Sequence, residues 1–93
     1  MTEELAIEKP ADTFTGSDST GRVILYNDEY HTFDEVIVQL MKAISCTAAE
    51  GKGMAWTVHT IGKCEVFKGH FEKCLGVSAI LEEIQLKTEI QMD

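Results

Sequence analysis

Two helix-start signals with the same spacing constrain this chain more than any other feature of its sequence. In a capping box, a Thr side chain caps the backbone three residues later, and a Glu there returns the contact. Thr32 with Glu35 and Thr47 with Glu50 both have this spacing. The first box is followed by apolar residues at helical intervals, namely Phe33, Val36, Ile37, Leu40, Met41 and Ile44. We therefore expect a helix directly after each box.

The second of these helices carries a weaker pattern. Met54, Ala55 and Val58 fall on one face of it, and Trp56 is predicted to point elsewhere. Gly62 is a plausible stop, because glycine readily adopts the left-handed conformation that ends many helices.

The remaining elements are three extended segments and a third helix. Residues 23–26 form an apolar run that ends at an Asn-Asp turn signal, residues 63–68 form a second run, and residues 86–92 alternate apolar and polar side chains. An apolar stripe between the last two predicts the third helix: Phe71, Cys74, Leu75, Ser78, Leu81 and Ile84. The order β-α-α-β-α-β predicts an α+β two-layer sandwich, with a three-stranded antiparallel sheet packed against three helices.

The chain divides into a polar leader and one folded unit. Residues 1–20 are rich in small polar and acidic residues with no periodic apolar face, which predicts a flexible N-terminal extension. Residues 21–93 are enough for a single domain with one modest core.

Composition excludes several classes of function. The net charge of −8 argues against binding to nucleic acid, since no basic patch could displace counterions. No apolar run approaches the ~20 residues of a membrane span. The cysteines Cys46, Cys64 and Cys74 form no CxxC pair, and no signal peptide precedes them, which favours a reduced, cytoplasmic location. Close pairs of zinc ligands are missing as well, so we expect no metal or other cofactor.

Acceptor groups beside apolar residues suggest a binding site. Asn27, Asp28 and Glu29 offer oxygens, and Phe33 and Val36 begin an apolar face a few residues later. A ligand with a positive end and an apolar side chain would suit such a site, and the free N-terminus of a peptide is one. Taken alone, however, an Asn-Asp pair is more often a turn in which the Asp side chain bonds its own backbone.

The histidines are ambiguous when judged from spacing alone. His59 could supply an unprotonated imidazole nitrogen to an ammonium group, or it could simply interact with a helix dipole. We expect His31 to be exposed next to a helix cap and His70 to start the third helix; spacing gives neither a chemical role.

Two sequence blocks in register resemble the ClpS adaptors of the Clp protease. Residues 23–30 match an apolar strand that runs into Asn-Asp-Asp-Tyr in that family, and residues 58–63 match its Val-His followed by Gly-Lys. The resemblance implies that Asn27, Asp28 and His59 surround a substrate's α-ammonium group. It places the following residues around the first side chain: Glu29, His31, Phe33, Val36, Ala55, Val58 and, as a candidate for the pocket floor, Leu86.

The resemblance also implies a task. ClpS adaptors hold proteins by a free hydrophobic or aromatic N-terminal residue, an N-degron, and pass them to the N-terminal domain of a Clp AAA+ unfoldase, without catalysing a reaction. We accordingly expect a monomeric, non-enzymatic adaptor with those partners, and no nucleic acid or membrane partner.

Three residues depart from the family pattern. Glu29 replaces the second Asp, Phe33 stands where many members have Met, and Ala55 stands where a larger apolar residue is usual. We hypothesise that Phe33 and Ala55 compensate in volume, so that the pocket keeps its capacity and changes its outline.

Two other classes of function remain open from sequence. One is a general protein-interaction module resembling the C-terminal domain of a ribosomal stalk protein, which would not recognise N-termini. The other, ranked last, is an enzyme that uses a Cys–His or Asp–His pair, since no nucleophile lies in a recognisable elbow or glycine-rich loop.

Overall fold

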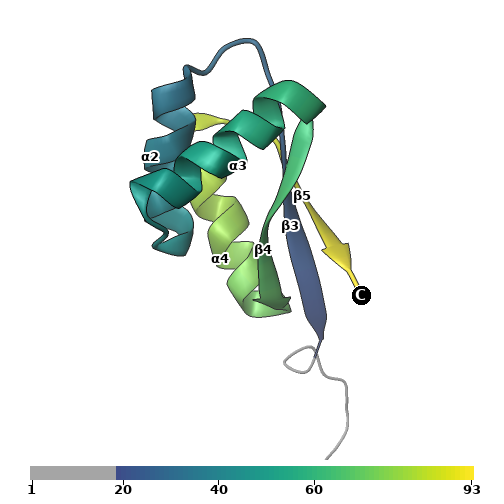
Figure 1. Cartoon of the computed structure of the whole chain (residues 1–93). Helices are drawn as coiled ribbons and strands as arrows, with labels where there is room; N and C mark the ends of the chain where they lie inside the picture. The colour runs from purple at the N-terminus through teal and green to yellow at the C-terminus, as the bar shows by residue number, and fades with distance from the viewer. Residues whose placement is uncertain (1–18) are drawn as a thin grey trace, which may run out of the picture.

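The predicted sheet is present, with its strands in the order β4-β3-β5 and all neighbours antiparallel (Figure 1). The computed structural model describes residues 19–93. In it, β3 (Thr20–Tyr26) lies between β4 (Lys63–His70) and β5 (Thr88–Met92). The extension predicted for residues 1–20 lies outside the described residues except at its end, where Thr20 already belongs to β3.

Three α-helices cover one face of this sheet (Figure 1). They are α2 (Phe33–Ile44), α3 (Ala48–Ile61) and α4 (Phe71–Leu81), and a short 3-10 turn, η2 (Glu82–Ile84), follows the last of them. Helix α4 contacts all three strands, α3 contacts β4, and α2 packs on α3 and α4. The α+β sandwich predicted from the sequence is therefore confirmed.

Both capping boxes form as predicted. The backbone N–H of Glu35 donates to Thr32 Oγ1 over 3.1 Å, and the N–H of Thr32 donates to Glu35 Oε1 over 2.7 Å. Thr47 and Glu50 repeat the arrangement at the start of α3. Gly62 ends α3 with φ of 101°, a left-handed conformation that glycine adopts without strain.

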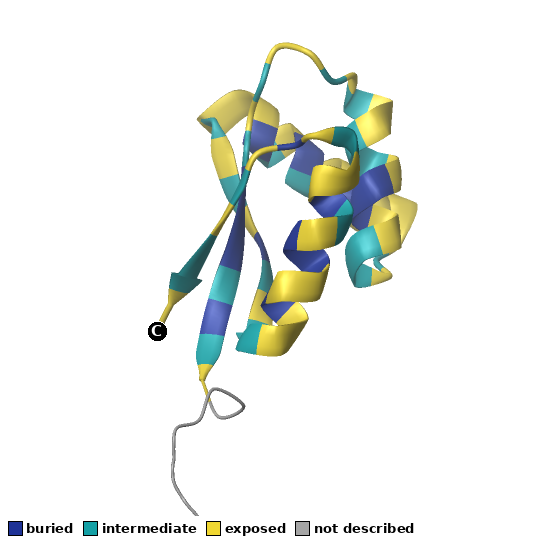
Figure 2. Ribbon diagram, turned by 180° about the vertical axis from the view of Figure 1, so that it is seen from behind, coloured by how far each residue is buried: buried dark blue, intermediate teal, exposed yellow. Residues whose placement is uncertain are grey.

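The core lies between the sheet and the helices. Figure 2 colours residues of β3 and α4 as buried, and these two elements contact each other. On α4 the buried positions are Cys74, Val77, Ser78 and Leu81, which follow the i, i+3, i+4, i+7 spacing of one helix face. Leu75 is one position off that face and is 48% exposed, so its predicted place in the buried stripe is wrong.

The last strand is shorter than its sequence pattern. Pairing begins at Thr88, and Leu86 is buried in the core before the strand starts. The alternation of residues 86–92 puts Met92 on the same face as Leu86 and Ile90, yet Met92 is 46% exposed at the end of the strand, where it pairs with Gly21.

Candidate functional site

A hollow of about 570 Å³ lies between the loop of residues 27–31, the start of α2 and one face of α3. Every site residue expected from the sequence lines it except Leu86. The lining residues are Asn27, Asp28, Glu29, His31, Thr32, Phe33, Val36, Lys52, Ala55, Trp56, Val58 and His59.

The floor of the hollow differs from the expectation. Ala55 and Val58, which are 3% and 4% exposed, form this floor. Leu86, the candidate for the floor, belongs instead to the core cluster. Leu86 is 3% exposed and is not among the residues that line the hollow.

The loop that carries the acceptors is fixed at both ends. The N–H of Asn27 donates to the carbonyl of Gly62 over 2.9 Å, which ties the loop to the end of α3, close in sequence to His59. Asp28 Oδ1 then accepts the N–H groups of Tyr30, at 2.9 Å, and His31, at 3.0 Å. Asp28 is therefore a turn former, as the common Asn-Asp pattern indicates.

His31 holds the other side of the loop, and both of its ring nitrogens face acceptors. Nδ1 lies 2.6 Å from Asp28 Oδ2, and Nε2 lies 2.5 Å from the carbonyl oxygen of Ile84. A carboxylate and a carbonyl can only accept, so each ring nitrogen must carry a hydrogen to make both bonds. Both contacts are therefore hydrogen bonds at the same time only when His31 is protonated.

The pKa shifts agree with this charge state. The hydrogen bond to Asp28 raises the pKa of His31 against the opposing effect of burial. Burial acts to raise the pKa of Asp28, but the hydrogen bonds from Tyr30 and His31 outweigh it and lower that pKa. The side chain of His31 is only 14% exposed, so the expectation of an exposed histidine is wrong.

The remaining acceptors stand at the rim. Asn27, Glu29 and His59 are exposed, so a ligand can reach them from solvent. His59 lies in the last turn of α3, with its ring centroid 6.0 Å from that of Trp56. This end of the hollow therefore combines oxygens with an imidazole, the groups that an ammonium ion needs.

Aromatic side chains form a wall beside these acceptors. The rings of Phe33 and Trp56 meet edge to face, with their centroids 6.4 Å apart and their planes at 81°. Trp56 was predicted to point away from the apolar face of α3, yet it lines the hollow. Sequence reasoning also missed Thr32 and Lys52. The spacing 52, 55, 56, 59, which is one helix face, could have revealed both Lys52 and Trp56.

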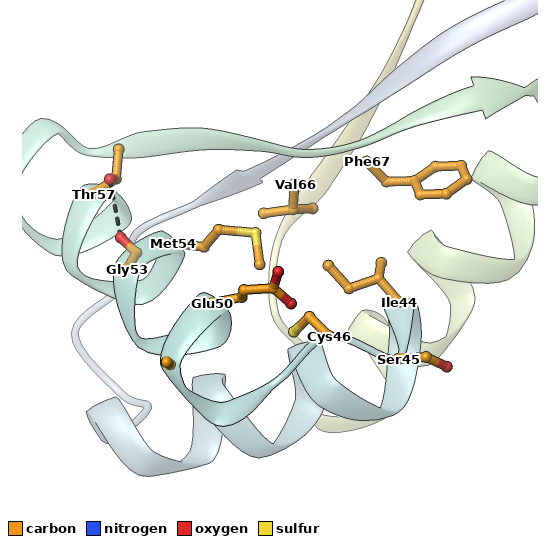
Figure 3. A pocket seen from close by; sticks show the side chains of 10 residues that line it. Ile44, Ser45, Cys46, Glu50, Gly53, Met54, Thr57, Val66 and Phe67 are labelled. Carbon is orange, nitrogen blue, oxygen red and sulfur yellow. Dashed lines mark hydrogen bonds between the residues drawn. The ribbon is translucent and has the colours of Figure 1, made fainter.

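A second hollow, of about 640 Å³, lies between the end of α2, α3 and β4 (Figure 3). Ile44, Met54 and Val66 point into it, and Glu50 is its charged residue (Figure 3). Oε1 of that carboxylate already accepts the N–H of Thr47 in the capping box. None of the site residues expected from the sequence lies here, so the first hollow is the better candidate for binding an N-terminal amine.

Within residues 19–93, no group of three or more His, Cys, Asp and Glu side chains is arranged to hold a metal ion. None of the helices described is long and apolar enough to cross a membrane.

Comparison with known proteins gives a consistent result. A solved structure of Agrobacterium tumefaciens ClpS2, bound to L-phenylalaninamide, has the same fold with a TM-score of 0.76 and 17% identity; the match covers 81% of this chain and 98% of that one. The human E3 ubiquitin-protein ligase UBR2 is 37% identical over 82 residues, which are 87% of this chain and 5% of the ligase.

A Drosophila melanogaster ligase, UBR1, is 36% identical over 59 residues, 63% of this chain and 3% of the ligase. This chain thus spans about a twentieth or less of the length of these curated relatives. The family model for the ATP-dependent Clp protease adaptor protein ClpS matches residues 17–89. The chain therefore belongs to the ClpS family.

Proposed function

We propose that this chain captures proteins by a free hydrophobic or aromatic N-terminal residue in the hollow described above, and delivers them for degradation. The proposal rests on the meeting of three segments at one hollow. The loop after β3, the start of α2 and one face of α3 bring acceptors and apolar side chains to one hollow of about 570 Å³. That volume is in the ordinary range for sites that bind small ligands.

The α-ammonium group would lie at the acceptor end. It has three donors and no acceptor, and Asn27, Glu29 and His59 offer accessible acceptors. Asp28 contributes less than a free carboxylate would, because Oδ1 already accepts the N–H groups of Tyr30 and His31 and Oδ2 contacts the His31 ring. We therefore assign more of the recognition to Asn27 and His59.

The first side chain would lie against Phe33, Val36 and the floor formed by Ala55 and Val58. Burying a Leu or Phe side chain contributes roughly 1.5–3 kcal/mol. Each hydrogen bond to the charged amine adds about 1.5–3 kcal/mol. After the cost of ordering a flexible peptide end, we expect a dissociation constant around micromolar.

The ligand in the ClpS2 structure supports this proposal. L-phenylalaninamide combines a free amine with an aromatic side chain, as the N-terminal residue of a protein does. By analogy, the amine of such a ligand would occupy the acceptor end here and its ring would lie beside Phe33 and Trp56.

A titration with paired peptides tests the proposal. A labelled peptide that begins with Phe should bind with micromolar affinity, and the same peptide with an acetylated N-terminus should bind at least a hundredfold more weakly. Acetylation removes the charge and two donors, and a site built for those groups rejects a ligand that lacks them. Equal binding of the two forms would favour a general interaction module instead.

The recipient of the captured protein is a separate part of the proposal. Membership of the ClpS family supports a Clp unfoldase, which would bind this chain through its N-terminal domain. A monomeric, non-catalytic adaptor in the cytoplasm fits that role. Retention of the chain on an immobilised Clp unfoldase N-terminal domain, and not on a ribosomal stalk-binding protein, would support it.

A second recipient is favoured by one observation. The identity of 37% to a human E3 ubiquitin-protein ligase supports a second proposal, in which the same capture site serves a ubiquitin ligase. Ubiquitin transfer to a Phe-starting reporter in an extract of the source organism, blocked by excess free Phe-starting peptide, would support this recipient over a Clp protease.

A further inference from the structure

Lys52 lies at the opposite end of the hollow from the amine acceptors. It lines the hollow together with His59 and comes seven residues earlier on the same helix, α3. Seven residues are two helical turns, so the two residues share a face and are separated by about 10.5 Å along the axis. Trp56 lies between them on that face.

The rim is therefore polarised. The backbone of Asn27 is tied to Gly62 at the end of α3, near His59, and Lys52 supplies a positive charge about two helical turns earlier on that helix. In the described part of the chain, the basic residues in ion pairs are Arg22, Lys42, Lys68 and, when protonated, His31, and Lys52 is not among them. A cation at this place is notable in a chain whose net charge is −8.

Lys52 follows a residue at which α3 packs closely on α2. The neighbouring Gly51 is buried and packs so closely on α2 that a Cβ at this glycine would lie 3.3 Å from Ile37 Cγ2. Lys52 itself is exposed. A group that meets its ammonium therefore lies on the rim rather than on the floor where the first side chain would lie.

We infer that Lys52 is a specificity-determining residue that favours an acidic side chain at the second or third position of the bound N-terminus. An extended peptide advances about 3.3 Å per residue, so its third residue lies about 7 Å from the first. The long side chain of Lys52 can cover the remaining distance. This inference rests on the proposed function, since it assumes that the amine is held near Asn27 and His59.

We expect a modest effect on affinity, because the ion pair between Lys52 and the acidic side chain of the peptide is exposed to solvent. Exposed ion pairs typically change an equilibrium by about two- to fivefold, and salt weakens them. The test uses unblocked peptides that begin Phe-Ala-Ala, Phe-Asp-Ala, Phe-Ala-Asp, Phe-Lys-Ala and Phe-Ala-Lys before a common tail. Their affinities are measured by fluorescence anisotropy for the full chain, for Lys52→Glu and for Lys73→Glu.

Lys73→Glu is the matched control, because Lys73 is an exposed lysine on α4 and does not line the hollow. In the unchanged protein, Asp at position two or three should strengthen binding about two- to fivefold over Ala, and Lys should weaken it. Lys52→Glu should reverse the order, so that the Lys peptides bind best. Lys73→Glu should leave it as it was.

The outcomes separate this inference from the function on which it rests. If free-amine peptides bind, acetylated ones do not, and Lys52→Glu leaves the order of affinities unchanged, the role of Lys52 is refuted and the capture site stands. A Tyr-starting peptide could bind more tightly than a Phe-starting one in the unchanged protein but not in Lys52→Glu, while Asp at position two or three has no effect. Lys52 would then contact the end of the first side chain, and the inference fails. If acetylation changes nothing, the capture site itself is refuted.

Discussion

Nδ1 of the His31 imidazole lies 2.6 Å from Oδ2 of the Asp28 carboxylate, a contact that is an ion pair when His31 is protonated. The backbone N–H of His31 also donates to Asp28 Oδ1, so the two residues are joined twice. Because the other ring nitrogen contacts the carbonyl of Ile84, the pair connects the acceptor loop to the turn that follows α4. Protonation of His31 therefore allows its ring to hold the acceptor loop and this turn together through two hydrogen bonds.

The stability of the domain should depend on pH through this pair. The pKa of His31 is raised above 6.5, so its contribution is fully present below about pH 6.5 and is lost as pH rises through the raised value. The pKa of Asp28 is lowered below 3.8, so its contribution is present above about pH 3.8 and is lost as pH falls through the lowered value. The pair should therefore stabilise the fold most between these limits.

Thermal melts of the unchanged protein and of His31→Gln, from pH 3 to 9, check this expectation. Glutamine can donate hydrogen bonds but carries no charge. The difference in melting temperature should be largest at roughly pH 4–6.5 and should shrink on either side. A difference that stays constant across the whole range would contradict the assignment of an imidazolium.

Replacing Asp28 by Ala should destabilise the fold as well as weaken capture. The carboxylate accepts two backbone N–H groups and one imidazole N–H, and its removal leaves partly buried donors unpaired. Losses of this kind cost about 1–3 kcal/mol. Urea unfolding at pH 6 should show the loss, and Asp28→Asn should recover part of it, because the amide oxygen can still accept from the backbone.

Replacing Asn27 by Ala should weaken peptide binding and leave the stability of the domain nearly unchanged. The side chain of Asn27 is exposed at the rim, and the loop is anchored by the backbone N–H of this residue, which alanine keeps. We expect the free energy of unfolding to change by less than about 0.5 kcal/mol. Affinity for a Phe-starting peptide should fall by about tenfold or more, the cost of one hydrogen bond to a charged group.

Gln91→Ala is the control for Asn27→Ala, since it removes an amide on β5, away from the hollow. Isothermal titration with the same peptide should give an unchanged affinity for it. If Asn27→Ala unfolds the domain at room temperature, Asn27 is a structural turn former and its assignment to the amine is wrong.

Local chemistry explains how much of the fold the sequence predicted. The two capping boxes and the glycine after α3 act within a few residues of themselves, so their spacing was enough to place α2 and α3. Leu75 and Met92 were misjudged because burial depends on what lies opposite, and that is set by tertiary packing. Leu86 illustrates the same limit, because a periodic pattern does not say where pairing with β3 begins.

The binding site was predictable only in part, for a related reason. Residues matched to a known family fell around one hollow, and only Leu86 did not. His31 could not be understood from sequence, since one of its acceptors is a carbonyl 53 positions away. Lys52 was missed because a lysine on a helix is usually a solvated surface residue, although its spacing from Ala55, Trp56 and His59 puts it on the helix face that lines the hollow.

The volumes of Phe33 and Ala55 should be coupled in the choice of the first residue. Both line the hollow, with Ala55 on its floor and Phe33 on the wall beside Trp56. Ala55→Met should fill the floor and weaken binding of a Trp-starting peptide by about tenfold, because the larger ring no longer fits. The change should weaken a Val-starting peptide less.

Phe33→Met in the same chain should recover part of that loss, since it restores space at the wall. For residues that share one cavity, we expect a coupling of about 0.5–3 kcal/mol in a double-mutant cycle measured with the Trp-starting peptide. Stability of each variant, followed by urea unfolding, separates a filled pocket from a strained core. If the two substitutions change affinity additively, or if peptides starting with Leu, Phe, Tyr, Trp, Ile and Val all bind the unchanged protein equally, the two positions do not shape one pocket.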